Sequence, residues 1–186
     1  MSTEDPIILE DGSSYLYRAY HALPPLENSK SQPTGAIKGV ISMIKKILID
    51  HPESDLAVVF DAKGKTFRHD MYTEYKANRP AMPEDLVSQI EPIHKIIQLM
   101  GIKLIMISGV EADDVIGTLA EQARNKKLDT VISTGDKDMT QLVCKNVSVV
   151  NTMTGELLDE SGVKEKFGVP PKHISADSYT HLRAHE

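Results

Sequence analysis

The chain has 186 residues, of which 40% are hydrophobic, and this is enough for one ordinary domain with a buried core. Its formal net charge of −6 excludes a protein that coats nucleic acid with its whole surface, because phosphate binding depends on clustered Lys and Arg. No apolar run reaches transmembrane length, and the N-terminus lacks the pattern of a secretory signal. With a single cysteine, Cys144, these features predict a cytoplasmic protein without an internal disulfide or a membrane partner.

Apolar strands and amphipathic helices alternate along the chain. In chain order, the patterns predict a strand at 7–9, a helix at 35–50, a strand at 56–60, a helix at 83–100, a strand at 102–107, a helix at 112–126, and strands at 130–134 and 147–150. The second helix contains Pro92 and is expected to end at Gly101. Apolar strands separated by such helices predict an α/β fold, in which helices cover both faces of a parallel central sheet.

The connection from Gly64 to Pro80 is the one long segment with weak core patterning, and such loops are usually functional or mobile. The basic and tyrosine residues in and just before it are Lys63, Lys65, Arg68, Tyr72, Tyr75, Lys76 and Arg79. On a helix, Lys76 and Arg79 would stand at positions i and i+3, from which both could bind one phosphate. Tyr75 could stack on an exposed base. The alternative is a solvated charged surface without a partner.

A carboxylate follows the end of each of the first four predicted strands. The set is Asp11, Asp61, Glu111, Asp113, Asp114, Asp136 and Asp138. Singly, each has an ordinary explanation, since Asp favours turns and acids stabilise the first turn of a helix. A parallel sheet, however, brings these strand ends to one edge, where the carboxylates would repel one another without compensation. Divalent cations that prefer oxygen ligands, Mg²⁺ or Mn²⁺, would compensate this negative charge. Zinc is not expected, because no Cys or His stands at a spacing that suits it.

An acidic edge that binds metal ions, next to a basic loop with tyrosines, predicts phosphodiester chemistry. A bound ion lowers the pKa of water and stabilises the charge that develops on a phosphate, and two ions about 3.5–4 Å apart do both. The residues alone therefore favour a metal-dependent hydrolase that acts on nucleic acid.

Several stretches that carry these residues resemble a known family. They are DGSSYLYRAYHALPPL, AVVFDAKGKTFRHDMYTEYKANRPAMPEDL, ISGVEADDVIGTLA and VISTGDKDMTQLV, with GVPP near the end. In this order they are similar to the N-terminal 5′ nuclease domain of bacterial DNA polymerase I, a member of the flap endonuclease family with a PIN-like (resolvase-like) core. The resemblance runs from about Ile7 to Pro171.

The resemblance implies a metal-dependent 5′-3′ exonuclease and structure-specific flap endonuclease for DNA replication and repair. Its substrates would be 5′ ends, flaps and nicks, RNA primers included, and its products would carry 5′-phosphate and 3′-hydroxyl ends. Mg²⁺ would be the cofactor, with Mn²⁺ as substitute and two ions in the complete domain. A monomeric protein with a polymerase domain in cis is expected in the natural gene.

The resemblance also implies roles for individual residues. All seven carboxylates become metal ligands, and residues 63–83 become a helical arch over the single strand. On a helix Asp113 would project about 100° away from Asp114, so Asp113 is expected closest to the first ion, with Glu111 and Asp114 supporting it directly or through water. Lys76 and Arg79 match phosphate-contacting positions, while Arg18 and Tyr75 match further substrate contacts. The remaining basic residues of the loop, Lys63, Lys65 and Arg68, are predicted to bind DNA. The predicted catalytic residues are Lys76, Arg79 and Asp113.

Two features depart from the family. Glu10 occupies a position that is usually apolar, and alternation points it away from Asp11 toward the helices, so either local strain or an exposed strand end is expected. The family continues beyond this region into a helix-three-turn-helix module, whereas residues 175–186 are interpreted as a non-family tail after a domain at 1–174. The alternative function is therefore a weak or inactive fragment that binds metal and DNA. A receiver-type signalling domain is disfavoured, because such domains cluster two acids after the first strand.

Overall fold

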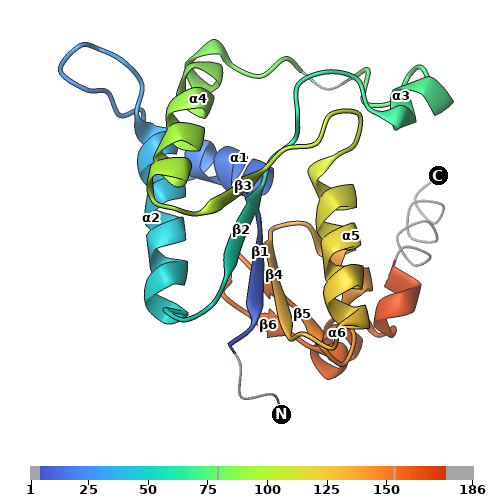
Figure 1. The fold of residues 1–186 in the computed structure, drawn as a ribbon. Helices are drawn as coiled ribbons and strands as arrows, with labels where there is room; N and C mark the ends of the chain where they lie inside the picture. Colours follow the sequence, from blue (N-terminus) through green and yellow to red (C-terminus); the bar gives the residue numbers. More distant parts are fainter. Residues whose placement is uncertain (1–4, 79, 153, 175–186) are drawn as a thin grey trace.

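The computed structural model of the chain describes residues 5–78, 80–152 and 154–174 (Figure 1). They fold around a six-stranded sheet with the strand order β3-β2-β1-β4-β5-β6. The strands are β1 (Ile7–Asp11), β2 (Leu56–Val59), β3 (Lys103–Ile105), β4 (Thr130–Thr134), β5 (Val147–Asn151) and β6 (Leu157–Leu158). The first five strands are parallel to one another, and β6 runs antiparallel to β5. The predicted parallel central sheet is confirmed, with one antiparallel edge strand added.

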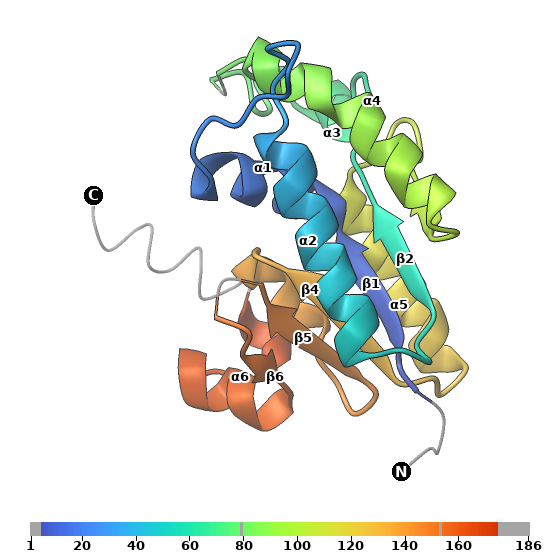
Figure 2. The ribbon, with the colours of Figure 1, turned by 90° about the vertical axis from the view of Figure 1, so that its left-hand side faces the viewer.

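Helices cover both faces of this sheet (Figures 1 and 2). The α-helices are α1 (Gly12–Ala22), α2 (Gly35–Asp50), α3 (Phe67–Met71), α4 (Glu84–Leu99), α5 (Ala112–Asn125) and α6 (Glu160–Phe167), and the 3₁₀ helices are η1 (Lys137–Leu142) and η2 (Pro171–His173). One core holds α1, α2 and α4 against the sheet, and the other holds α5, η1 and α6. No helix in the described ranges is long and apolar enough to cross a membrane.

Successive residues at the end of β2 pack into the two cores on opposite faces of the sheet. Val58 and Phe60 pack with α1, α2 and α4, whereas Val59 packs with α5, because neighbouring side chains of a strand point to opposite faces. All three are at most 3% exposed. Complete burial of one such side chain contributes about 1.5–3 kcal/mol, so both helix layers are held firmly on the sheet.

Glu10, on the central strand β1, is completely buried. Its side chain faces the α1 side, where Tyr15 lies, as alternation predicted, but the expectation of an exposed strand end is wrong. Neither of its carboxyl oxygens has a hydrogen-bond partner, and burial raises its pKa well above the ordinary value. The departure from an apolar residue therefore leaves an unsatisfied acid inside the protein.

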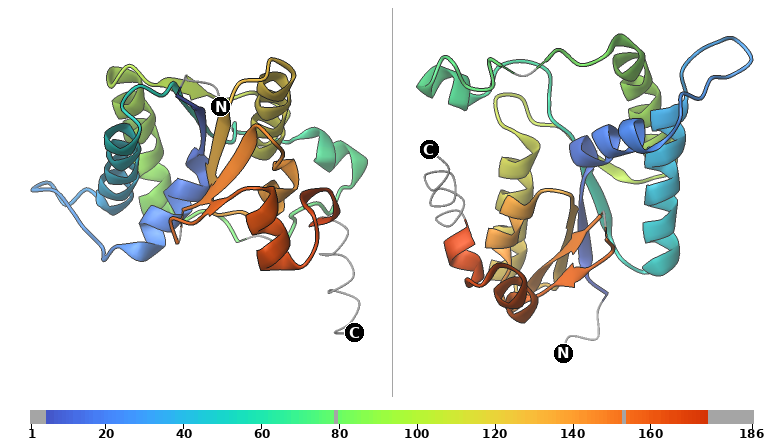
Figure 3. Two further views of the ribbon diagram at one scale, coloured as in Figure 1. Left: turned by 90° about the horizontal axis from the view of Figure 1, so that it is seen from below. Right: turned by 180° about the vertical axis from the view of Figure 1, so that it is seen from behind.

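The segment between β2 and α4 extends beyond the carboxyl ends of the strands (Figures 1 and 3). It corresponds to the predicted arch, but its described residues contain only the short helix α3, followed by turns at 73–78. Lys76 lies in these turns with a φ of 56°, so its predicted place on a helix is wrong. Arg79 itself lies outside the described residues, as does the tail at 175–186.

Candidate active site

Three of the predicted carboxylates stand at the carboxyl ends of adjacent strands. Asp11 is the last residue of β1, while Asp61 and Asp136 each follow two residues after β2 and β4. The strand order reverses direction between β1 and β4, and in open α/β sheets ligands bind at such a reversal, beyond the carboxyl ends of the strands. The topology therefore gathers these acids where a ligand site is expected.

Asp113, in the first turn of α5, lies within the electrostatic reach of this group. Burial, together with repulsion from Asp11, Asp136, Asp61 and Glu111, raises its pKa to about 6. The pKa of Asp11 is likewise raised by burial and by the charges of Asp61 and Asp136. Negative charge is thus concentrated around Asp113, as a cation site requires.

Hydroxyl groups that the sequence reasoning missed fix the loops of this edge. Asp11 accepts a hydrogen bond from the Thr134 hydroxyl at 2.7 Å and another from the Ser14 amide at 2.9 Å, which caps α1. Thr134 in turn accepts from the Asp136 amide at 3.1 Å, and the Ser13 hydroxyl accepts from the Asp61 amide at 3.0 Å. The signal was present in DGSS and STGD, where hydroxyl residues stand beside the acids.

Asp61 and Asp114 accept hydrogen bonds from backbone amides at the N-terminus of α5. Asp61 accepts from the amide of Ala112 at 2.8 Å, and Asp114 accepts from the amide of Glu111 at 3.1 Å. The first amides of a helix have no partner within the helix, so these bonds satisfy groups that would otherwise need water. The acids of this stretch are therefore helix-capping residues as well as candidate ligands.

Three residues of the segment between β2 and α4 contact Glu111 and Asp114 at the start of α5. The Lys76 ammonium lies 2.7 Å from one carboxyl oxygen of Glu111, and the Tyr75 hydroxyl donates to the other at 3.1 Å. Arg68 donates to both oxygens of Asp114, at 2.5 and 2.7 Å. This pairing lowers the pKa of Asp114 and raises that of Arg68. The basic segment and the acidic edge are thus joined directly.

The other predicted site residues are more scattered. Lys63 and Lys65 are exposed in the loop between β2 and α3, while Arg18 is half-buried on α1, where its charge acts on Glu10. Asp138 is exposed at the start of η1, where its amide donates to Asp136 at 2.8 Å. Asp138 lines a cleft of about 650 Å³ together with Asp113, Asp114, Asp136 and Arg68.

The donor set at this edge consists of carboxylate oxygens, which suit hard divalent cations such as Mg²⁺ and Mn²⁺. In residues 5–78, 80–152 and 154–174, no three Asp, Glu, His or Cys side chains are placed as ligands of one ion. Several of the carboxylates are instead turned toward groups of the chain itself, as Asp11, Asp61 and Glu111 are. The chemistry of the donors and the charge repulsion at Asp113 fit a cation.

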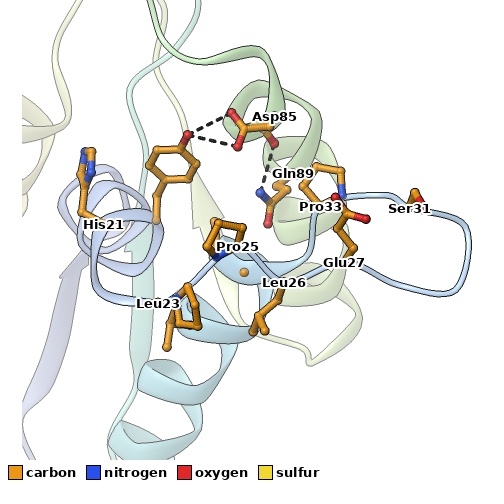
Figure 4. A pocket seen from close by; sticks show the side chains of 13 residues that line it. His21, Leu23, Pro25, Leu26, Glu27, Ser31, Pro33, Asp85 and Gln89 are labelled. Atoms are coloured by element: carbon orange, nitrogen blue, oxygen red, sulfur yellow. Dashed lines mark hydrogen bonds between the residues drawn. The ribbon is translucent and has the colours of Figure 1, made fainter.

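A second cavity, of about 490 Å³, lies away from the acids between the ends of α1, α2 and α4 (Figure 4). Tyr20 donates through its hydroxyl to both carboxyl oxygens of Asp85, at 3.0 and 3.1 Å. Gln89 donates to the Asp85 carbonyl and accepts from the Ile37 amide. These polar groups are satisfied by one another, and no predicted site residue lines the cavity.

The sheet, its order and the acids at the strand ends define an α/β domain with an acidic ligand edge. The chain belongs to the family described as the 5′-3′ exonuclease, N-terminal resolvase-like domain, whose model matches residues 6–168. The resemblance predicted from the sequence motifs is confirmed.

Relatives support this assignment at high identity. The chain is 57% identical over 172 residues to DNA polymerase I of Pseudomonas aeruginosa, a match that covers 92% of this chain and 19% of that protein. It is 48% identical over 167 residues to the 5′-3′ exonuclease of Buchnera aphidicola, covering 90% of this chain and 55% of that protein. The chain thus spans only part of the length of either relative.

Solved structures share the fold at lower identity. The T5 D15 protein, co-crystallised with metal ions, superposes with a TM-score of 0.70 at 21% identity, covering 88% of this chain and 61% of that one. The catalytic core of Rad2 in complex with a DNA substrate gives a TM-score of 0.57 at 19% identity, covering 92% and 52%. The predicted nuclease-type fold is therefore confirmed.

Proposed function

We propose that this domain is a metal-dependent 5′-3′ exonuclease and structure-specific flap endonuclease that acts on DNA in the bacterial cytoplasm. The observation that carries the proposal is the concentration of carboxylates around Asp113, with the basic segment of Lys76 joined to the same edge. The family and its relatives named 5′-3′ exonuclease support it. The proposed substrates are 5′ ends, flaps and nicks, RNA-primed ends included.

The residues proposed to hold Mg²⁺, with Mn²⁺ as substitute and two ions in all, are the carboxylates of the acidic edge. Asp11 and Asp113 would contribute most directly, since the charges of Asp61 and Asp136 raise the pKa of each. Asp61, Asp136 and Glu111 would complete the set. Bound cations would lower the pKa of a water molecule and neutralise charge on the scissile phosphate.

The chain's own residues position the substrate. Lys76, whose ammonium lies against Glu111, can exchange that carboxylate for a phosphate oxygen without leaving the edge. Arg79, outside the described residues, is proposed to contact the same phosphate, and the neighbouring Tyr75 is proposed to stack on a base. We also propose a monomer with a polymerase domain in cis as the natural context, and the name of the Pseudomonas aeruginosa relative, DNA polymerase I, supports the polymerase domain.

Cleavage of a 5′-labelled flap duplex during a Mg²⁺ titration tests this proposal. Asp113→Asn should reduce the cleavage rate by about a hundredfold or more, because it removes charge from the centre of the acidic edge. Asp50→Asn is the matched control, since Asp50 lies on the surface of α2 in an exposed pair with Lys46. Equal cleavage by the wild type and Asp113→Asn would refute the assigned site, whereas binding of the flap without turnover would support the alternative of an inactive binding fragment.

A further inference from the structure

A two-bond ion pair joins the segment between β2 and α4 to α5. Arg68, on α3, presents one terminal nitrogen to each carboxyl oxygen of Asp114, at 2.5 and 2.7 Å. The two side chains are only 32% and 27% exposed. A bidentate pair of this kind fixes orientation as well as distance, because the planar guanidinium matches the carboxylate.

The same carboxylate also organises the first turn of α5. Asp114 accepts from the amide of Glu111 at 3.1 Å through Oδ2, which also accepts from Arg68, so one carboxylate binds both Arg68 and the start of its own helix. A backbone contact lies beside this pair, since the Phe67 amide donates to the Gly109 carbonyl at 2.9 Å. The base of α3 is therefore attached to the α5 entry at two points.

Asp113 and Asp114, although adjacent in sequence, have different surroundings. Asp113 lies near the other edge carboxylates, whereas Asp114 is paired with Arg68. Both oxygens of Asp114 and both terminal nitrogens of Arg68 are engaged in the pair. Lys76, by comparison, contacts Glu111 through a single ammonium on a flexible stem.

We propose that Arg68 is a positioning residue that holds the base of the arch segment on α5, and that Asp114 is its partner. In this arrangement Arg68 does not bind a DNA phosphate and Asp114 does not ligate a metal ion, which revises the roles expected from the sequence. The pair keeps the loop that carries Glu111 and Asp113 in place. Its consequence for cleavage rests on the proposed nuclease function, but the attachment itself does not.

Hydrogen exchange of the 186-residue chain, without DNA or metal, tests the attachment. Arg68→Gln and Asp114→Asn should each speed amide exchange in residues 67–71 by about tenfold, and the double variant should add little to either, because both remove one contact. Lys63→Gln, which changes an exposed charge of the same segment, is the control and should leave exchange unchanged. Unchanged exchange in both single variants, or full additivity in the double variant, would overturn the proposal.

Arg68→Lys separates geometry from charge. Lysine keeps the positive charge but cannot make two parallel bonds to one carboxylate, so its exchange should resemble that of Arg68→Gln. Exchange at the wild-type rate would show that charge alone suffices and would refute the role of the bidentate pair.

The salt dependence of binding to a 5′-flap duplex in EDTA tests the second half of the proposal. Loss of one phosphate contact lowers the slope of log K against log salt by about 1. Lys76→Gln should show this change and Arg68→Gln should not. An equal reduction in both variants would assign Arg68 to DNA. If the wild type binds no flap DNA, the proposed function fails, while the exchange experiment still decides the attachment.

Discussion

Replacement of Glu10 by Leu should make the protein more stable at neutral and alkaline pH. The wild-type carboxyl is completely buried on the central strand, and neither oxygen has a hydrogen-bond partner. An unsatisfied buried polar group costs about 1–3 kcal/mol, and a leucine of similar volume removes it. The expected gain in the free energy of unfolding at pH 8 is therefore about 1–3 kcal/mol, or roughly 2–12 °C in Tm for a domain of this size.

The pH dependence of this gain follows from the raised pKa of Glu10. Below its ordinary value of 4.5, the acid is neutral in both the folded and the unfolded state, and its contribution to stability is fully present. As the pH rises above that value, the unfolded state ionises while the folded state keeps its proton, so the contribution is progressively lost. The advantage of Glu10→Leu should consequently be larger at pH 8 than at pH 5.

Urea denaturation at both pH values measures the effect. Glu91→Leu, at an exposed position of α4, is the control and should change the free energy of unfolding little at either pH. Glu10→Gln keeps the shape of the side chain but cannot ionise. Its free energy of unfolding relative to the wild type should therefore also be higher at pH 8 than at pH 5. A Glu10→Leu protein that is less stable than the wild type at pH 8, or a gain that does not depend on pH, would refute the reasoning.

Two further substitutions test the edge and the helix packing. Thr134→Val removes the hydroxyl that donates to Asp11 at 2.7 Å. The free energy of unfolding, measured by thermal denaturation, should fall by about 1–3 kcal/mol, and the Mg²⁺ affinity, measured by calorimetry, should fall about tenfold or more. An unchanged Mg²⁺ affinity would contradict the role of Thr134 in positioning Asp11. Gly39→Ala would place a Cβ 2.6 Å from that of Ala19, so it should destabilise the α1–α2 contact by about 1–3 kcal/mol in urea denaturation. Gly117→Ala, with no neighbour closer than 3.8 Å, is its control, and equal loss in both would contradict the packing argument.

Elements with strong periodicity were predicted well from the sequence. The helix at 35–50 and the strand at 130–134 have the predicted bounds, because their apolar positions follow one period without interruption. The helix α1 was missed because its buried residues form a short stripe of mixed character around Tyr15 and Leu16. Its start was marked all the same by Asp11, which acts as N-cap as well as candidate ligand.

Within the candidate site, parallel topology alone predicted that the acids would gather at the strand ends. The hydrogen-bond partners of those acids could not be predicted, because they depend on contacts between distant segments. Arg68 and Asp114 are 46 positions apart, and no local pattern predicts their pairing. The turn conformation of Lys76 was missed for a different reason, because the charge spacing suggested a helix in a segment that lacks a continuous apolar face to stabilise one.

The pairing of β1 with β4 brings residues 7–10 beside residues 130–133, so the acidic edge depends on contacts that are remote in sequence. Such contacts are slow to form, because a long stretch of chain must be ordered before they contribute. Asp11 and Asp136 can therefore meet only in molecules whose central sheet is already assembled. A cation that binds between them would bind the folded state alone and would stabilise the entire domain in proportion to its affinity and concentration.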